Sequence, residues 1–201
     1  MTLPLFLFIV VVVVLLIALS RRPHPLNRIR KPRVVRIPNP VLGTLNLIGP
    51  SANALLEEDL QQIREYFSEI RQTEDVAPLC DVLLLYCEID SSGAIKGSPV
   101  RLREIIRNAS AVIVVVATDN PLENSMAAYE EAPYGDANLM MTTDRKGPLL
   151  GAFLARLFEQ MQRGVSMPIA WHNISPQIPG LKRDDLPESL CVLDFGQVTF
   201  E

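Results

Sequence analysis

The stretch ASAVIVVVATDN, residues 109–120, decides the fold class of this chain. Its middle, from Ala111 to Val116, is apolar and mostly β-branched, and polar residues bound it on both sides. A short run of this kind is typical of a strand that helices cover on both faces. It ends in the polar tip Thr118-Asp119-Asn120, and open α/β sheets hold their ligands at such strand ends. The stretch therefore predicts an α/β domain and the sheet edge that carries its site.

Apolar stretches on either side of this strand complete the predicted sheet. Further strands are predicted over residues 42–48, 81–89 and 137–142, with an edge hairpin or a fifth strand from 191–195 and 197–200. Alternation of strands with helices at this spacing implies parallel strands and right-handed crossovers. The predicted fold is therefore α/β, Rossmann-like or flavodoxin-like, with a mostly parallel sheet and flanking helices.

Helical spacing of large apolar residues predicts the helices between these strands. On the first of them the acidic residues, Asp59 among them, are expected to face solvent. Beyond residue 165 the pattern loosens, and we expect a connection broken by prolines. The predicted helices cover residues 55–71, 99–107, 122–132 and 149–162.

The first twenty residues predict a membrane anchor. No charged or polar side chain occurs from Leu3 to Leu19, and a helix of about 17–19 residues at ~1.5 Å each just spans a hydrocarbon core of ~30 Å. Basic residues follow this run and none precedes it, so the positive-inside rule puts the amino terminus outside and the rest in the cytoplasm. A cleaved signal peptide ending at Ala18-Leu19-Ser20 is the alternative. The expected localisation is single-pass, in the inner (cytoplasmic) membrane of the cell.

Charge is divided sharply between the spacer and the predicted domain. Residues 21–41 carry seven of the 19 lysines and arginines, five prolines and no acid, which predicts an extended juxtamembrane spacer beside anionic lipid headgroups. From residue 37 onward 12 bases face 23 acids, a net charge of −11. Direct binding to DNA or RNA duplexes needs clustered positive charge, so it is not expected. The predicted domains are the anchor over 1–20, the spacer over 21–41 and a cytoplasmic α/β domain over 42–201.

Four strand tips share one edge of such a sheet and supply the candidate site. They hold hydroxyls, small residues and two adjacent cations, which suit a small phosphorylated ligand. The alternative is that turn-forming residues collect there for structural reasons. Replacing Arg145 and Lys146 together by alanine is expected to weaken nucleotide binding without unfolding the domain. The predicted ligand-binding residues are Gly49, Pro50, Ser51, Ser91, Ser92, Thr118, Asp119, Asn120, Thr143, Arg145 and Lys146.

Catalytic and metal chemistry find little support in the sequence. It contains neither a GxxxxGK[ST] phosphate loop nor a GxGxxG motif, and its two histidines lie away from the predicted strand tips. The three cysteines lack ligand spacing and are expected to be small apolar residues in a reducing compartment. Glu123, Glu130 and Glu131 follow the central strand and are open to an acid–base role, but they also fit a solvated helix face. No catalytic residue, metal or cofactor is therefore predicted.

The order of anchor, spacer and domain resembles small single-pass effectors that carry a CRISPR-associated Rossmann-fold (CARF) domain. The resemblance covers the anchor and residues 42–162, and its motifs are Gly49-Pro50-Ser51 and the segment from Asn138 to Lys146. Thr143-Asp144-Arg145 stands where the family's loop carries paired glycines. The resemblance implies a homo-oligomeric sensor that binds a cyclic oligoadenylate and signals to the membrane in antiviral (phage) defence.

Two other families are similar to parts of the chain. IIRNAS (105–110), the central strand, Asn120 and Glu130 resemble the middle of Toll/interleukin-1 receptor (TIR) domains, whose enzymatic members cleave NAD with a glutamate on that helix. DVLLLYCEID (81–90), a glycine turn and the central strand resemble caspase-like and CHAT (caspase HetF-associated with TPRs) domains. That resemblance implies a non-catalytic relative, because the expected histidine is replaced near Glu88 and the expected cysteine near Thr118. The membrane-anchored sensor is the function expected first, and NAD cleavage and a non-catalytic scaffold are the alternatives.

Overall fold

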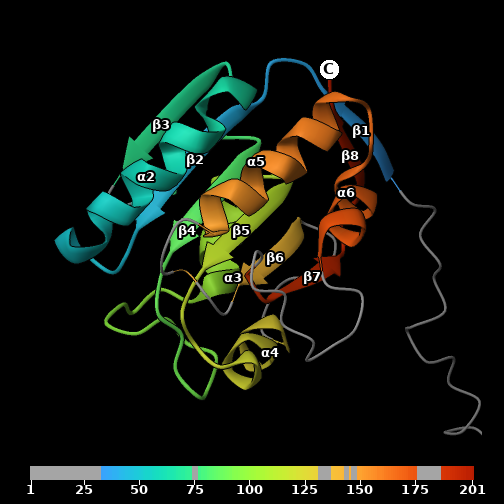
Figure 1. Ribbon diagram of the computed structural model, residues 1–201. Coiled ribbons are helices and arrows are strands. Elements are labelled where there is room, and N and C mark those ends of the chain that lie inside the picture. The colour runs from blue at the N-terminus through green and yellow to red at the C-terminus, as the bar shows by residue number, and fades with distance from the viewer. Residues whose placement is uncertain (1–32, 74–76, 131–136, 143–144, 146–148, 176–186) are drawn as a thin grey trace, which may run out of the picture. The chain divides into compact units, whose positions relative to one another are not determined.

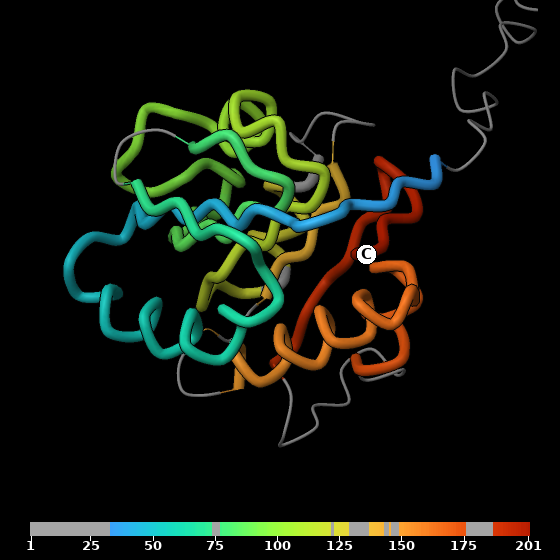
Figure 2. Tube along the Cα trace, turned by 90° about the horizontal axis from the view of Figure 1, so that it is seen from above, coloured from blue at the N-terminus to red at the C-terminus, as the bar shows by residue number. Residues whose placement is uncertain are grey.

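The computed structural model describes residues 33–73, 77–130, 137–142, 145, 149–175 and 187–201 (Figures 1 and 2). They belong to one compact unit that runs from Pro32 to Glu201. Within these ranges no helix has both the length and the apolar content that crossing a membrane requires. The predicted anchor, and the predicted spacer up to residue 32, lie outside the described residues.

A six-stranded sheet forms the middle of this unit, in the order β3-β2-β4-β5-β6-β7 (Figure 1). Neighbouring strands are parallel, except that the last strand is antiparallel to β6. The predicted α/β fold with a mostly parallel sheet is therefore confirmed. The strands are β2 (Val41–Asn46), β3 (Glu69–Thr73), β4 (Val82–Tyr86), β5 (Ile113–Ala117), β6 (Asn138–Thr142) and β7 (Ser189–Leu193).

Helices cover both faces of the sheet. Successive strand residues point to opposite faces, so Leu84 of β4 belongs to one hydrophobic core and its neighbours Leu83 and Leu85 belong to the other. The first core takes its helical residues from α2, α5 and α6, and the second from α3 and α4. The helices are α2 (Asn53–Ile63), flanked by the short helices η2 (Pro50–Ala52) and η3 (Arg64–Tyr66), and α3 (Leu102–Ala109), α4 (Leu122–Glu130), α5 (Leu149–Gln162) and α6 (Met167–Ile174).

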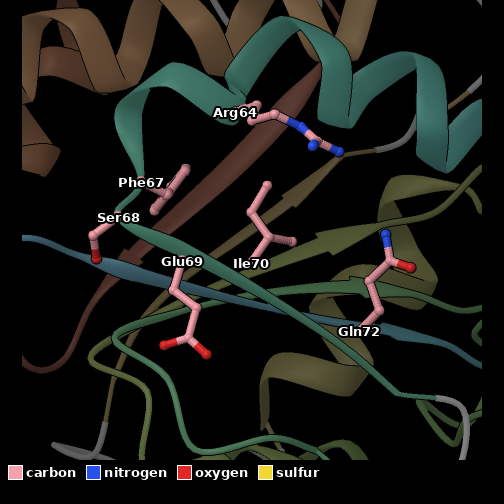
Figure 3. A pocket seen from close by; sticks show the side chains of 6 residues that line it. All are labelled: Arg64, Phe67, Ser68, Glu69, Ile70 and Gln72. Carbon is pink, nitrogen blue, oxygen red and sulfur yellow. The ribbon is translucent and has the colours of Figure 1, made fainter.

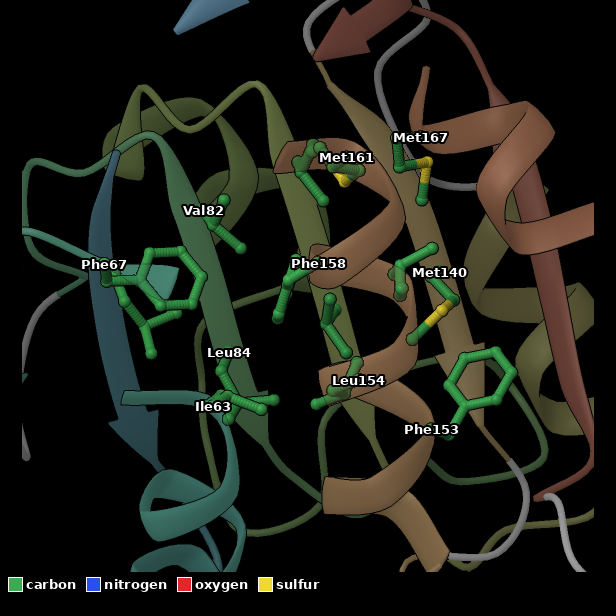
Figure 4. Close-up of a cluster of buried hydrophobic side chains, with 14 of the residues drawn as sticks. Ile63, Phe67, Val82, Leu84, Met140, Phe153, Leu154, Phe158, Met161 and Met167 are labelled. Carbon is green, nitrogen blue, oxygen red and sulfur yellow. The ribbon is translucent and has the colours of Figure 1, made fainter. Parts of the chain in front are cut away.

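Helix α5 contributes more of the first core than any other described helix (Figure 4). Phe153, Leu154 and Phe158 project from it onto the strands. The ring centroid of Phe158 lies 5.0 Å from that of Phe67 and 5.7 Å from that of Phe200. Aromatic pairs at these distances add roughly 0.5–1.5 kcal/mol to the gain from burial alone. Helix α5 therefore joins the β2–β3 side of the sheet to the carboxyl-terminal strand.

Two strands pair outside the main sheet. β1 (Arg33–Ile37) and β8 (Gly196–Phe200) are parallel, with Val35 opposite Val198. Part of the predicted spacer is therefore a strand of the compact unit. Two alternatives were predicted for the last residues. The further strand is confirmed, because β7 pairs with β6 at the edge of the main sheet, and the hairpin is wrong, because β8 pairs with β1 instead of with β7.

Asn138 explains why the last two strands separate. Its side-chain amide donates to the carbonyl oxygen of Gly196 (2.6 Å), and its Oδ1 accepts from the N–H groups of Phe195 and Gly196 (both 3.1 Å). A buried amide therefore satisfies the backbone groups of the bend, which would otherwise lack partners. With its backbone groups satisfied in this way, the chain can turn from one sheet to the other.

Two predictions for the helical regions are wrong. The helix predicted over residues 55–71 ends at Ile63, and residues 69–73 form β3 instead. Phe67 and Ile70 fit the helical spacing, but Phe67 ends η3 in an extended conformation and Ile70 pairs with β2 in the edge strand. Both side chains still pack against the first core. The proline-broken connection predicted after residue 165 contains α6, because Pro168 occupies the first turn, where a missing N–H costs nothing.

Gly93 lets the turn after β4 pack directly on helix α4. Its φ of +82° favours glycine, and a Cβ at this position would lie 2.5 Å from the backbone nitrogen of Ala128. Gly97 also has a positive φ, of +73°, but nothing lies within 4 Å of its Cβ position. Because only Gly93→Ala forces α4 to move, we expect it to lower the free energy of unfolding by about 1–2 kcal/mol more than Gly97→Ala does. Urea unfolding of both variants measures the difference, and equal losses would show that α4 does not depend on this contact.

Candidate functional site

The carboxyl ends of β2, β4, β5 and β6 lie along one edge of the sheet, because these strands are parallel neighbours. From β2 the chain moves outward to β3, and it then returns past β2 to reach β4. This is the flavodoxin-like order, in which ligands bind in the crevice where the connections diverge. The switch point lies between the ends of β2 and β4, so the loops after these strands flank the candidate site.

A buried arginine pairs with two carboxylates at this edge. Arg145 follows β6, and its Nη2 lies 3.0 Å from Oε1 of Glu88 and 2.9 Å from Oδ2 of Asp119. Its backbone N–H also donates to Oδ1 of Asp119 (2.7 Å). The arginine side chain is 8% exposed, against 29% for Glu88 and 17% for Asp119. These three side chains, the Glu88–Arg145–Asp119 cluster, join the ends of β4, β5 and β6 and carry a net charge of −1.

Asn120 joins the loops after β4 and β5. Its Oδ1 accepts from the backbone N–H of Ile89 and from the hydroxyl of Thr118. On the next turn of chain, Asn124 donates from Nδ2 to the carbonyl oxygen of Ile89 (3.0 Å). Thr118 and Asn120 are both buried. Their hydrogen bonds connect the loops after β4 and β5, which carry Glu88 and Asp119, and so fix the positions of these two carboxylates.

Asp59 and Tyr86 form a buried pair behind the Glu88–Arg145–Asp119 cluster. The Tyr86 hydroxyl donates to Oδ2 of Asp59, and the guanidinium carbon of Arg145 lies 5.9 Å from the centroid of the Tyr86 ring. Burial raises the pKa of Asp59 from 3.8 to about 6, although hydrogen bonds from Tyr86 and from the Gly151 N–H oppose this. The expectation that Asp59 faces solvent is therefore wrong. Leu56 and Ile63, three residues before Asp59 and four after it, are buried on the same face of the helix. This spacing in the sequence could have indicated that Asp59 is buried too.

The loop after β2 is held by a single asparagine side chain. Oδ1 of Asn46 accepts from the N–H groups of Ile48 (3.0 Å) and Gly49 (3.2 Å), and its Nδ2 donates to Asn53 (2.7 Å). Gly49 has a φ of +97°, and nothing lies within 4 Å of its Cβ position. The loop is therefore fixed in shape and open on its outer side.

The predicted site residues lie at this edge where the structure describes them, but they have different surroundings. Gly49, Pro50 and Ser51 start η2 after β2. Ser91 and Ser92 lie in an exposed turn, where Asp90 accepts from the Ser92 hydroxyl (2.6 Å). Thr118, Asp119 and Asn120 follow β5, and Arg145 is buried beside them. Thr143 and Lys146 lie outside the described residues.

Glu88 and Tyr86 belong to this site and were not among the predicted ligand-binding residues. Tyr86 ends an otherwise aliphatic strand, and Glu88 is the first charged residue after it. Both therefore lie at the carboxyl end of β4, whereas the prediction took its site residues from the following turn, at residues 91–92. Choosing candidates from the last residue of the strand onward would have included both.

Thiol and metal chemistry receive no support from the described residues. Burial raises the pKa of Cys87 to about 12 and that of Cys80 to about 11, so both thiols stay protonated near neutral pH. Within the described ranges no three histidine, cysteine, aspartate or glutamate side chains gather in a way that would hold a metal ion. The side chain of Glu130 lies outside the description.

Comparison with known proteins gives no family assignment: the chain matches no protein-family model and no curated protein.

Proposed function

We propose that this chain is a non-catalytic binding protein, similar in design to caspase-like and CHAT domains, and that its ligand lies at the carboxyl edge of the sheet. One observation carries the proposal. Glu88 and Thr118 occupy the positions near which that family has its histidine and cysteine. They lie two residues after β4 and one residue after the neighbouring strand β5. These positions therefore carry a carboxylate and a hydroxyl, and Arg145 pairs with Glu88 and with Asp119.

The groups at these two strand ends do not make a nucleophile with its base. The hydroxyl of Thr118 donates to an amide oxygen, that of Asn120, and it is buried. Asp119 is held by the backbone and side chain of Arg145. Cys87 is buried and its thiol is protonated near neutral pH. A nucleophile needs an adjacent base or a lowered pKa, so a ligand at this edge would be bound without being cleaved.

Arg145 and Glu88 define the chemistry that this edge would recognise. Nε and Nη1 of Arg145 are buried and donate to no acceptor among the described residues, and the Glu88 carboxylate beside them is partly exposed. A ligand that offers an acceptor to the arginine and a donor to the carboxylate fits both groups. The amide of an extended peptide has this pattern, and so does the edge of a nucleobase. A bare phosphate is less suited here, because two carboxylates already offset the single guanidinium.

A nucleotide sensor is the second candidate, and the loop after β2 favours it. This loop lies across the switch point from the Glu88–Arg145–Asp119 cluster, and nothing lies within 4 Å of the Cβ position of Gly49 in it. A base held by Glu88 and Arg145 would place a phosphate toward this loop. In this version the chain is a membrane-anchored homo-oligomer that signals when a cyclic oligoadenylate shifts its conformational population.

Native mass spectrometry of the purified full-length chain tests the proposal. We expect a ligand to co-purify with the wild type and with Glu159→Gln, whose carboxylate pairs with Arg163 on the exposed face of α5. In Glu88→Gln the bound fraction should fall at least roughly tenfold, because a charged hydrogen bond to the ligand is lost. The mass of the ligand separates a peptide from a cyclic oligonucleotide.

Two outcomes would contradict the proposal. One is equal occupancy in Glu88→Gln and Glu159→Gln, which would place the ligand elsewhere. The other is release of nicotinamide from NAD by the wild type and not by Glu130→Ala, which would establish the TIR-like enzyme instead.

A further inference from the structure

The outer edge of β3 is an unpaired sheet edge. Ser68 donates its backbone N–H to the carbonyl oxygen of Pro40, and the parallel ladder with β2 continues from there. Alternate residues of a strand bond to the same neighbour, so the N–H and C=O groups of Glu69 and Arg71 point away from β2. Within the described part of the chain they have no backbone partner. Such an edge is a template for another strand.

A hollow of about 290 Å³ lies beside this edge (Figure 3). Ile70 and Phe67 supply its apolar part, and Arg64 and Gln72 lie beside them on the side of η3. Glu69 points to the opposite side of the strand. On that side Arg71 lies next to Leu79, whose side chain is 66% exposed, and donates to its carbonyl oxygen (2.8 Å). Both sides of β3 therefore leave apolar surface uncovered.

The charges of β3 are self-complementary about Ile70. Within one chain Arg71 donates to both carboxylate oxygens of Glu69 (2.9 and 2.8 Å), on the exposed side of the strand. If a second β3 runs antiparallel with Ile70 opposite the partner subunit's Ile70, then Glu69 faces the partner subunit's Arg71, and Arg71 faces the partner subunit's Glu69. In this register the two outer pairs are those that exchange both backbone hydrogen bonds.

We propose that β3 is a homodimer interface, in which two copies of this chain join their sheets edge to edge. The register supplies four backbone hydrogen bonds and two cross-strand ion pairs, and it brings the partner subunit's Ile70 to the apolar part of the hollow. Charged side chains ordinarily protect an edge strand from pairing. Here they oppose the two neighbouring antiparallel registers, in which Glu69 would face the partner subunit's Glu69 or Arg71 would face the partner subunit's Arg71. The same charges that deter foreign strands therefore favour a second copy in the self-complementary register.

Charge reversal tests this interface with its own internal control. Glu69→Arg gives two positive side chains at these positions and Arg71→Glu gives two negative ones, so each variant alone places like charges opposite each other. We expect the dimer dissociation constant of the full-length chain to rise at least roughly tenfold in either variant. An equimolar mixture of the two variants should restore the dimer as a heterodimer. The double variant Glu69→Arg, Arg71→Glu should dimerise like the wild type.

Sedimentation velocity in a mild detergent gives the masses, and circular dichroism checks that each variant is folded. A monomeric wild type would overturn the proposal, and so would a dimer that neither single variant weakens, since another segment would then hold it. A mixture that fails to recover also overturns it, because any partner other than a second copy would be unaffected by mixing. The outcome is independent of the ligand experiment above. That experiment measures ligand occupancy at the Glu88–Arg145–Asp119 cluster, whereas this one measures association through β3.

Discussion

Arg145→Met is expected to lower the free energy of unfolding by about 3 kcal/mol or more. Removing one partner of a buried ion pair leaves its partner charge uncompensated, which typically costs ~3–5 kcal/mol. Here two carboxylates lose the pairing with Arg145 together, and the lower part of that range applies because the Glu88 side chain is 29% exposed. Urea unfolding at neutral pH measures the loss. Of the ion pairs in the described ranges, this is the most deeply buried one.

Arg163→Met is the matched control, because Arg163 pairs with Glu159 through the same type of bond but is 70% exposed. Exposed pairs of this kind contribute roughly 0.3–0.5 kcal/mol. The triple variant Arg145→Met, Glu88→Gln, Asp119→Asn removes all three charges and should recover part of the stability lost by Arg145→Met alone. Similar losses in Arg145→Met and Arg163→Met would show that the cluster is open to solvent.

Asp59 is expected to make the protein less stable as the pH rises from about 4 to about 6. The pKa of this carboxyl is raised from 3.8 to about 6 in the folded protein. Between these values the folded state keeps a proton that the unfolded state has released, so the free energy of unfolding falls with rising pH. A shift of this size corresponds to about 2–3 kcal/mol. The contribution is complete below pH ~4 and has gone above pH ~6.

Asp59→Asn removes this titration, so we expect the variant to gain stability over the wild type as the pH rises through this window. Urea unfolding between pH 3.5 and pH 7 gives the difference at each pH. Asp90→Asn is the control in which the pKa shift has the opposite sign, because hydrogen bonds from Ser92 lower the pKa of Asp90. A constant difference between Asp59→Asn and the wild type would show that the folded protein has Asp59 ionised throughout.

The burial of Arg145 changes how its role in binding can be tested. From the sequence, alanine at Arg145 and Lys146 was expected to weaken nucleotide binding without unfolding the domain. Because Arg145 joins the ends of three strands, we expect its removal to lower stability, so a loss of binding in that variant would not show that the arginine contacts a ligand. Glu88→Gln avoids this difficulty, since the Asp119 pair still holds the arginine.

Local sequence was enough to predict the interior strands and their direction. Runs such as VLLLY (82–86) and IVVVA (113–117) are buried on both faces, and apolar character on both faces requires helices above and below. The segments between them are long enough for helical crossovers, which makes the strands parallel. These two facts already place the tips after β2, β4, β5 and β6 at one edge, as the structure confirms.

Pairing partners at the rims of the sheet depended on the whole fold. Residues 69–73 suit a helix in isolation, and they form a strand because β2 offers a free edge there. The last two strands part because the amide of Asn138, far away in sequence, satisfies the bend between them. Short-range sequence patterns do not contain information about such distant partners. The sequence therefore predicted a helix over residues 55–71 and left both a hairpin and a further strand open at the carboxyl-terminal end.

The sequence by itself therefore determined the fold class, the parallel core and the edge where the candidate site lies, because burial periodicity and connection length are local properties. Only the tertiary structure decided which polar residues at that edge are exposed and which are neutralised. Arg145 and Asp59 have ordinary charged side chains in the sequence. Arg145 is buried against Glu88 and Asp119, which lie 57 and 26 residues away along the chain. Asp59 is buried against Tyr86, 27 residues away. These contacts form only when strands and helices that are distant in the sequence meet.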